Sequence, residues 1–339
     1  MPKLRLGVLG LGRMGQVYAY HVARQLDGAA LAAVADPRQD VTADFTSRVA
    51  GVQVFADYRD LLAQPDIDGV IVATPTSTHG EVVIAAAEAR KAIFCEKPTS
   101  LDLATTDRMI AAVERAGVLF QVGFMRRFDD GCADAKRQLE AGVIGQPVAI
   151  RSIGRDAGRT SLEFANPAVS GGLILDMGIH DFDLIRWYMG SEVERVYTET
   201  AALAYPELQT VGDVDYAMIS LKFDNGALGN VEVSRDAVYG YDIQCEIIGT
   251  QGTLKVGYLQ YTPVVVVTKA GVTHDIVPHF PQRFGKAYVR QIEHFADCLI
   301  HGTQPLVTPA DARAALQIGV AATRSQHEGR PITVRDVTP

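Results

Sequence analysis

The sequence has few cysteines and no long apolar segment. Its four cysteines (Cys95, Cys132, Cys245 and Cys298) lie far apart and form no C-x-x-C pair. Neither a zinc site of that spacing nor a compact disulfide framework is therefore expected. Isolated thiols are typical of a reducing compartment, so we expect a cytoplasmic protein. No apolar run reaches the roughly 18 residues that span a bilayer, and no membrane association is expected.

Basic charge is also scarce. The chain has 32 Lys and Arg residues against 40 Asp and Glu, which gives a formal net charge of −8, and no Lys/Arg cluster. A nucleic-acid-binding protein would present a basic patch, so nucleic acid is not expected as a partner. The apolar start at 4–11 contains Arg5 and leads into a glycine motif, which indicates a first strand and not a signal peptide. The length of 339 residues favours two domains over one.

The first 122 residues alternate short apolar runs with helical stretches. Strands are predicted at 3–9, 31–35, 52–55, 69–73, 92–95 and 119–122. Helices are predicted at 14–26, 41–50, 58–63, 78–90 and 101–116. This alternation favours an α/β fold in which a parallel sheet is covered by helices. We expect residues 1–122 to form this domain.

The pattern changes in the second domain, which we expect over residues 123–339. Strands without intervening helices are predicted at 193–201, 215–223, 227–234, 241–248, 252–256 and 264–268, after one at 147–153. Turn signals at 224–226 and 249–252 join several of them, which favours an antiparallel sheet. Helices are predicted at 131–140, 172–189, 286–301 and 309–327.

A glycine motif lies at the first strand-to-helix turn. Gly10, Gly12 and Gly15 form a G-x-G-x-x-G, whose glycines permit a tight turn, close approach of a pyrophosphate and close helix packing. Asp36 ends the next strand, about 20 positions later, where a carboxylate accepts hydrogen bonds from a ribose 2′-hydroxyl. The pattern predicts NAD as the cofactor. Arg38 leaves NADP open, because it can pair with a 2′-phosphate; a solvated surface role is the alternative.

Two further loops follow strand ends in this domain. Thr74-Pro75-Thr76 follows the strand at 69–73, and Glu96-Lys97-Pro98 follows the strand at 92–95. Loops at the carboxyl ends of parallel strands reach a ligand at the crevice of the sheet. Lys97 can project into that crevice, whereas an exposed turn lysine is the alternative. His79 is interpreted as a packed or capping residue or, alternatively, as a cofactor contact.

The segment 171–183 carries polar residues on an otherwise apolar stretch. If it is helical, Asp176, His180 and Asp183 fall at i, i+4 and i+7 and share one face. A carboxylate one turn before an imidazole on a buried helix is costly without a partner. The stripe therefore predicts acid–base chemistry on a bound substrate. Asp183 is interpreted as a structural hydrogen-bonding residue or, alternatively, as a substrate contact.

Together these motifs resemble the glucose–fructose oxidoreductase/inositol dehydrogenase (Gfo/Idh/MocA) family of nicotinamide-dependent oxidoreductases. The match comprises the glycine turn, Thr74-Pro75, Glu96-Lys97-Pro98 and Gly171-Gly172…Asp176-x-Gly178-x-His180…Asp183, and it covers nearly the whole chain. The resemblance implies a Rossmann domain joined to an α/β domain with a large, mostly antiparallel open sheet. In the family that sheet face commonly mediates assembly, so a homo-oligomer, a dimer or a homotetramer, is expected.

The resemblance also implies a reaction. Segments 123–129 and 283–288 look like the inositol dehydrogenase branch, which implies NAD-dependent oxidation of a cyclic polyol such as myo-inositol to its 2-keto product. Lys97, Asp176 and His180 carry over as catalytic residues. His180 suits a general base, Lys97 can hold the reacting oxygen, and Asp176 can orient the substrate or the imidazole.

Contact residues follow from the same resemblance. The expected cofactor contacts are Gly10, Gly12, Arg13, Met14, Gly15, Asp36, Arg38, Thr74, Pro75, Thr76, His79, Glu96, Lys97 and Tyr288. The expected substrate contacts are Lys97, Arg127, Asp156, Asn166, Asp176, His180 and Tyr239. On an extended segment Arg126 and Arg127 would point to opposite sides, so only one of them would face the substrate. A salt bridge between loops is the alternative for Arg127.

Three rival interpretations remain at this stage. The first is a sugar or pyranose dehydrogenase, or a glucose–fructose-type oxidoreductase, that uses NADP; Arg38 favours it and Asp36 opposes it. The second is a non-catalytic nucleotide-binding sensor, because function resides in the site and not in the fold. The third, a zinc site on Asp176 and His180, needs further ligands that no His/Cys cluster supplies, so no metal is expected.

Overall fold

The computed structural model describes residues 3–339, which divide into two compact units. The first unit runs to Met125 and takes up again at Lys286–Arg313. The second comprises Arg126–Gly285 and Ala314–Pro339. The division predicted from the sequence has one boundary, at residue 122, whereas this division by compactness returns to the first unit near the C-terminal end.

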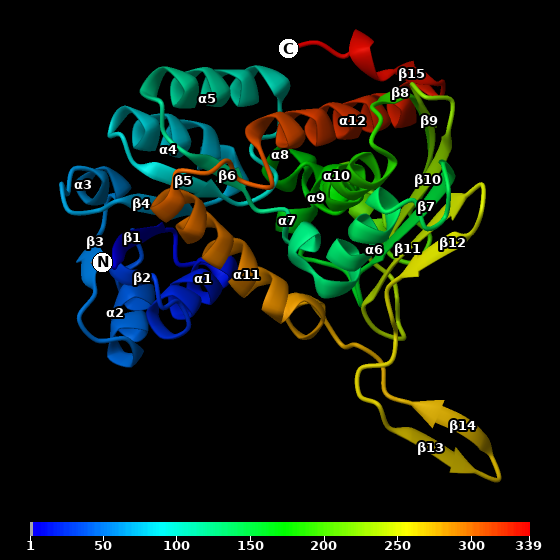
Figure 1. The fold of residues 1–339 in the computed structure, drawn as a ribbon, viewed down its shortest axis with the longest axis horizontal. Coiled ribbons are helices and arrows are strands. Elements are labelled where there is room, and N and C mark those ends of the chain that lie inside the picture. Colours follow the sequence, from blue (N-terminus) through cyan, green and yellow to red (C-terminus); the bar gives the residue numbers. More distant parts are fainter. Residues whose placement is uncertain (1–2) are drawn as a thin grey trace. The chain divides into compact units, whose positions relative to one another are not determined.

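A six-stranded parallel sheet forms the centre of the first unit (Figure 1). Its order is β3-β2-β1-β4-β5-β6, with β1 (Leu4–Leu9), β2 (Ala29–Ala35), β3 (Gln53–Phe55), β4 (Gly69–Val72), β5 (Ala92–Cys95) and β6 (Phe120–Val122). Strands β4 and β5 are buried at every position, as strands covered on both faces are. The strand order reverses between β1 and β4, and ligands of such sheets bind at this switch point, outside the carboxyl ends.

The helices of this unit begin and end at sequence signals. They are α1 (Arg13–Arg24), α2 (Gln39–Arg48), α3 (Tyr58–Leu62), α4 (Thr76–Glu88) and α5 (Leu103–Ala116). Asp102 caps α5 by accepting the Thr105 N–H at 2.7 Å, and Gly117, with a φ of 65°, ends it.

Helix α11 (Phe280–His301) joins the first unit from Lys286 onward. The Gln121 side-chain amide of β6 donates to the Gln291 carbonyl oxygen of this helix at 2.7 Å. The backbone N–H of Val122 donates to the Val307 carbonyl oxygen at 3.3 Å. The first unit is therefore completed by a segment that follows the second sheet in the sequence.

The second unit contains a seven-stranded sheet of order β12-β11-β7-β10-β9-β8-β15. Its strands are β7 (Pro147–Arg155), β8 (Val193–Ala201), β9 (Tyr216–Phe223), β10 (Leu228–Ser234), β11 (Asp242–Gly249), β12 (Thr253–Val256) and β15 (Ile332–Thr333). Neighbouring strands are antiparallel except β7 and β10, which run parallel. The mostly antiparallel sheet predicted from the sequence is confirmed. The parallel pair brings two carboxyl strand ends together.

Helices cover the sheet of the second unit. They are α6 (Asp130–Glu140), α7 (Leu162–Ala165), α8 (Pro167–Ser170), α9 (Gly172–Asp176), α10 (Gly178–Met189) and α12 (Pro309–Glu328), with the 3₁₀ helices η1 (Met125–Phe128), η2 (Pro206–Val211) and η3 (Val334–Asp336). Helix α10 packs on β7 and β10. Within residues 3–339, no helix combines the length and apolarity that a membrane crossing requires.

The strand predicted at 264–268 does not join the large sheet. Strand β13 (Val265–Thr268) pairs only with β14 (Gly271–His274), in a ribbon that Figure 1 shows extending from the second unit. Every residue of both strands is exposed. The run of valines thus predicted a strand correctly, whereas its place in the large sheet was wrong.

Candidate active site

The glycine turn between β1 and α1 leaves one position open to a ligand. Gly10 has a φ of 87°, and a Cβ there would lie 2.8 Å from the Ala73 carbonyl oxygen. A Cβ at Gly15 would lie 1.8 Å from the Gly10 carbonyl oxygen, whereas one at Gly12 would meet nothing within 4 Å. Packing therefore explains Gly10 and Gly15. The open side at Gly12, next to the N-terminus of α1, fits a pyrophosphate.

Asp36 is a buried carboxylate at the end of β2. It accepts the backbone N–H of Leu11 in the glycine turn at 2.7 Å and binds Arg38 through Nε at 2.9 Å and Nη2 at 2.8 Å. Burial acts to raise the pKa of Asp36, but hydrogen bonds from Arg38 and Leu11 outweigh it, and the net pKa is lowered. Asp36 is therefore ionised at neutral pH, and its charge is matched by the half-exposed Arg38 guanidinium.

His79 joins the loops that follow β4 and β5. Its side chain is 1% exposed, and its ring nitrogens lie 2.9 Å from the carbonyl oxygens of Pro98 and Thr74. Burial lowers the pKa of His79, and the two carbonyl oxygens oppose that effect. The same region contains the cis Lys97–Pro98 peptide and Pro75, which precedes the first residue of α4, Thr76.

Glu96 belongs to a buried hydrogen-bonded chain next to Lys97. The Gln291 amide donates to the Tyr18 hydroxyl at 2.8 Å, the Tyr18 hydroxyl donates to Glu96 Oε1, and the Lys97 backbone N–H donates to Glu96 Oε2 at 3.0 Å. Burial raises the pKa of Glu96, while the Tyr18 hydroxyl and Lys97 oppose that rise. Tyr288 packs edge-on against Tyr18, with ring centroids 6.2 Å apart. This series of hydrogen bonds fixes the backbone at Lys97.

The single helix predicted over 172–189 is two helices. Helix α9 ends at Asp176 and α10 begins at Gly178, with Met177 between them. The His180 N–H donates to the Met177 carbonyl oxygen, a tighter contact than that of a regular α-helix. The one-helix spacing predicted for Asp176, His180 and Asp183 was therefore wrong. From Gly172 to His180, nevertheless, Asp176 and His180 are the two residues that are not buried.

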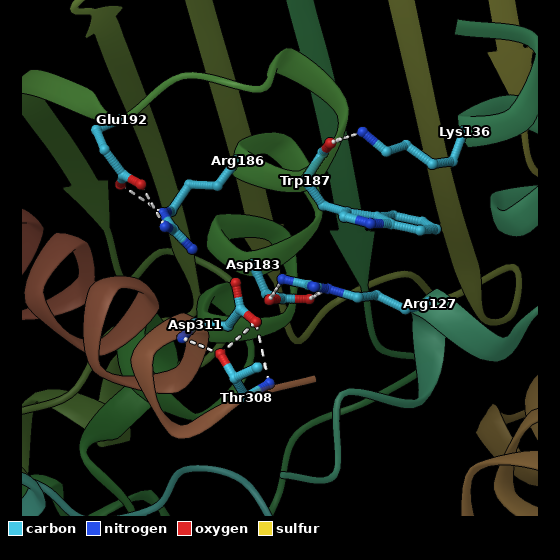
Figure 2. A network of polar contacts seen from close by, with 8 residues as sticks. All are labelled: Arg127, Lys136, Asp183, Arg186, Trp187, Glu192, Thr308 and Asp311. Atoms are coloured by element: carbon cyan, nitrogen blue, oxygen red, sulfur yellow. Dashed lines mark hydrogen bonds and ion pairs between the residues drawn. The ribbon is translucent and has the colours of Figure 1, made fainter. Parts of the chain in front are cut away.

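Arg126 and Arg127 both pair with carboxylates of α10. Arg126 Nη1 lies 2.6 Å from Asp181 Oδ1, and Arg127 binds Asp183 through two nitrogens at 2.5 and 2.9 Å. Figure 2 shows the Arg127–Asp183 pair close to Trp187, over whose ring the Arg127 guanidinium lies. The arginines occupy the 3₁₀ helix η1, so the predicted extended segment was wrong. The structure thus gives Arg127 a salt bridge and Asp183 a structural hydrogen-bonding partner, as one interpretation of each expected.

The other predicted substrate contacts have local partners in the second unit. The Asp156 N–H donates to the Ser234 carbonyl oxygen at 2.9 Å, at the carboxyl ends of β7 and β10. Asn166 Oδ1 accepts the Ala168 N–H at 2.9 Å and caps α8. The Tyr239 hydroxyl donates to Asp242 Oδ2 at 2.7 Å and accepts from Arg155. Across residues 3–339, no three His, Cys, Asp or Glu side chains gather as metal ligands.

Asp176 has two supporting residues, Arg235 and Asp213, that were not identified from the sequence. Arg235 lies 3.2 Å from Asp176 through Nη2 and 2.5 Å from Asp213 through Nη1. No spacing rule connects Arg235 with Asp176, because they lie on different elements and far apart in the chain. The only signal in the sequence was a cation directly after a predicted strand.

A parallel sheet of Rossmann order, an open glycine turn and a buried carboxylate after β2 define a dinucleotide-dependent oxidoreductase. Comparison with known families agrees. Residues 4–124 match the NAD-binding Rossmann fold of an oxidoreductase family, and residues 136–334 match its C-terminal alpha/beta domain. The chain therefore belongs to the Gfo/Idh/MocA oxidoreductase family, and the family resemblance seen in the sequence is confirmed.

Individual relatives match over almost the entire chain. A scyllo-inositol 2-dehydrogenase (NAD(+)) of Bacillus subtilis is 42% identical, over 97% of this chain and 96% of its own. A myo-inositol 2-dehydrogenase of Thermotoga maritima is 38% identical, over 98% and 99%. The structure of scyllo-inositol dehydrogenase from Lactobacillus casei with bound NAD(H) and scyllo-inositol is 30% identical, with a TM-score of 0.94 and coverage of 98% and 100%.

Two alanine substitutions separate packing from cofactor binding in the glycine turn. We expect Gly15→Ala to lower the melting temperature by several degrees, because overpacking costs about 1–3 kcal/mol. Gly12→Ala should leave the melting temperature nearly unchanged but weaken NAD binding about tenfold or more, because the new methyl group occupies the open side of the turn. Thermal denaturation measures the melting temperature of each variant, and calorimetric titration measures its affinity for NAD. Wild-type NAD affinity in Gly12→Ala would contradict the assignment.

The Asp36–Arg38 pair predicts how cofactor preference can be changed. Asp36→Ala should raise the KM for NAD and lower that for NADP, because it removes the carboxylate partner of the ribose hydroxyl and releases a guanidinium that suits a 2′-phosphate. Steady-state kinetics with both cofactors measure the change. The Asp36→Ala/Arg38→Ala double variant is the control, and its KM for NADP should not be lowered. If that KM is as low as in Asp36→Ala, Arg38 is not the phosphate partner.

Proposed function

We propose that this protein is an NAD-dependent inositol 2-dehydrogenase, which oxidises one secondary hydroxyl of an inositol to a ketone. The observation that carries the proposal is its 42% identity, over 97% of the chain, to a scyllo-inositol 2-dehydrogenase (NAD(+)). The similarity to a myo-inositol 2-dehydrogenase supports the same substrate class. The two relatives differ in the named stereoisomer, so the substrate is an inositol, with myo- and scyllo-inositol as the first candidates.

The first unit supplies the cofactor half of the proposed reaction. Gly10, Gly12 and Gly15, with Arg13 and Met14 at the start of α1, are proposed to hold the pyrophosphate, and Asp36 and Arg38 the adenosine ribose. Thr74-Pro75-Thr76, His79, Glu96 and Tyr288 complete the proposed contacts. When bound, NAD accepts the hydride that the alcohol carbon loses.

Lys97, Asp176 and His180 are the proposed catalytic residues. His180 takes the hydroxyl proton as general base, a role that suits an imidazole near neutral pH. Lys97 donates a hydrogen bond to the reacting oxygen and stabilises its developing negative charge. Asp176 orients the substrate or the His180 ring. Both Asp176 and His180 lie on the incompletely buried positions of α9 and α10, which supports their access to a substrate.

The remaining hydroxyls of an inositol need several polar partners. Arg127, Asp156, Asn166 and Tyr239 are proposed to contact them. A contact with the inositol hydroxyls is best supported for Asp156, which follows the carboxyl end of β7 next to β10. Arg127 and Tyr239 already have protein partners, so their role would include keeping those carboxylates in place.

An NADP-dependent sugar dehydrogenase is the second candidate function. The observation in its favour is the Arg38 guanidinium, which is half-exposed and lies next to the ribose-binding carboxylate proposed above. A pyranose carries a ring of hydroxyls comparable to that of an inositol, so the same polar partners would serve it.

We also propose assembly through the outer face of the large sheet. Leu228 on β10, Ala149 on β7 and Ile248 on β11 follow one another across that face by register, and Met218 on β9 lies on the same side. Leu228, Ile248 and Met218 are exposed apolar side chains. Exposed apolar side chains on an open sheet face favour a subunit interface, which supports a homo-oligomer, a dimer or a tetramer.

A reducing, cytoplasmic location is proposed as well. All four cysteines are buried and unpaired in the structure. Proteins that keep such thiols are typical of compartments in which thiols stay reduced.

An assay of NADH formation tests the proposed function. Purified protein with NAD should produce NADH with myo- or scyllo-inositol, and a panel of other inositols and of pyranoses, each also tried with NADP, tests the second candidate. His180→Ala should lower kcat by about 10²–10⁴-fold, because the general base is lost. NAD affinity, measured by calorimetry, is the control and should not change. Absence of turnover with every substrate would reject the proposal in favour of a nucleotide-binding sensor.

Substitution of Leu228 tests the proposed interface. Leu228→Arg places a second positive charge beside Lys222 on this face, so we expect the assembly to dissociate to a smaller species. Analytical ultracentrifugation measures the mass, and Leu203→Arg, at a highly exposed apolar position outside the large sheet, is the matched control. A wild-type monomer, or an unchanged mass for Leu228→Arg, would contradict this interface.

A further inference from the structure

Arg235 lies between two carboxylates inside the second unit. It is 1% exposed, and its guanidinium bridges Asp213 Oδ2, 2.5 Å from Nη1, and Asp176 Oδ2, 3.2 Å from Nη2. Asp213 is buried, whereas the Asp176 side chain is 18% exposed. The guanidinium therefore connects the interior of the unit with a carboxylate that reaches its surface.

Asp213 is fixed by the start of helix α9. Its Oδ1 accepts the Leu173 N–H at 2.8 Å. A Cβ at Gly172 would also lie 2.8 Å from this oxygen, and Gly172 has a φ of 71°. The Gly171-Gly172 pair of the sequence motif thus has a physical reason, because a side chain at the second glycine would displace the Asp213 carboxylate.

The same ion cluster holds both ends of α9. Asp213 binds the backbone at its second residue, Leu173, and Arg235 binds its last residue, Asp176. The backbone around the two partners is fixed as well, because the Arg235 N–H donates to the Asp215 carbonyl oxygen at 3.0 Å and the Asp213 N–H to the Leu208 carbonyl oxygen at 3.1 Å. A helix of five residues has little rigidity of its own, so its position depends on these ties.

The cluster also sets a local charge. Two carboxylates share one guanidinium, and a buried ion is tolerated only when it is paired. Asp213 alone would satisfy that need, since its oxygen lies 2.5 Å from Nη1. The second contact extends the same positive charge to Asp176. The extent to which the negative charge of Asp176 is neutralised therefore depends on how much of the positive charge of Arg235 acts on Asp213 instead.

We propose that Arg235 and Asp213 are positioning residues for the oxidation: they hold Asp176 at the end of α9 and set the negative charge that it presents to the substrate and to His180. This inference rests on the proposed function, in which Asp176 orients the alcohol or the imidazole. Neither residue touches the reacting atoms in this proposal; both act through Asp176.

The inference predicts opposite changes in two variants. Arg235→Met removes the positive charge beside Asp176, so more of the negative charge of Asp176 acts on His180 and favours its protonated form. The acidic limb of kcat/KM against pH should then move to higher pH by about one unit. Asp213→Asn removes the competing carboxylate but keeps an oxygen for the Leu173 N–H. The full positive charge then acts on Asp176, and the limb should move to lower pH.

Other charged groups around α9 are unchanged in both variants: most have partners of their own, and Glu163 on α7, which packs against α9, is exposed. On the elements that pack against α9, the pairs are Asp181–Arg126, Asp183–Arg127, Arg186–Glu192, Glu232–Arg155 and Arg324–Glu328, and Lys222 donates to the Gly226 carbonyl oxygen. A shift of the limb therefore reports on the Arg235 cluster.

The experiment measures kcat/KM against pH for the wild type and both variants, with the inositol that the wild type oxidises. The Kd for NAD, from calorimetry, should stay within about twofold, because the proposed NAD contacts are residues of other elements. Arg283→Met is the matched control, since Arg283 forms another buried pair in this unit, with Asp129 at 2.6 Å. Arg283→Met should lower the melting temperature but leave the acidic limb of kcat/KM at the same pH as in the wild type.

Each outcome decides the inference. Opposite shifts of the two limbs, with an unchanged limb in Arg283→Met, support it. Limbs that coincide with the wild type would show that Arg235 and Asp213 serve stability alone, and would overturn it. If Arg235→Met does not fold, as judged by circular dichroism, the Asp213→Asn profile decides. A wild type without activity on any inositol instead refutes the proposed function, which keeps the two failures distinct.

Discussion

Most of the buried carboxylates in the second unit have a guanidinium beside them. In the second unit, Asp181 pairs with Arg126, Asp183 with Arg127, and Asp176 shares Arg235 with Asp213. Burying such charges without partners is prohibitive, and removing one partner of a buried pair costs about 3–5 kcal/mol. The pairs therefore hold α9 and α10 in place. Because the arginines come from η1 and from the end of β10, the helices that carry the proposed catalytic residues depend on segments far away in the sequence.

The first unit fixes its proposed cofactor contacts by backbone interactions. The Leu11 N–H binds Asp36, and His79 lies between the carbonyl oxygens of Thr74 and Pro98. Glu96 accepts the N–H of Lys97 and is supported by Tyr18 and Gln291. A site that binds the constant part of a dinucleotide can be built on main-chain positions. Recognition of one polyol among many needs side chains, which we propose that the second unit supplies.

Prediction from the sequence succeeded where the pattern is local. The alternation of strands and helices identified the parallel sheet, and the turn signals at 224–226 and 249–252 do lie between β9 and β10 and between β11 and β12. It failed where long-range contacts decide. The helix at 172–189 is interrupted at Met177, the 264–268 strand forms a separate ribbon, and η1 replaces an extended segment. In the candidate site, the sequence indicated Lys97, Asp176 and His180 but not Arg235 or Asp213, which no local spacing connects with Asp176.

The sequence by itself determined the family, the parallel sheet of the first unit and the residue types proposed for hydride-transfer chemistry. These follow from motifs of a few residues, whose glycines, prolines and alternating apolar positions act locally. Only the tertiary structure decided which charges are paired, why Gly172 must lack a side chain, and that α11 completes the first unit. Those features depend on atoms brought within a few ångströms by the packing of distant segments, and a linear pattern carries no record of such distances.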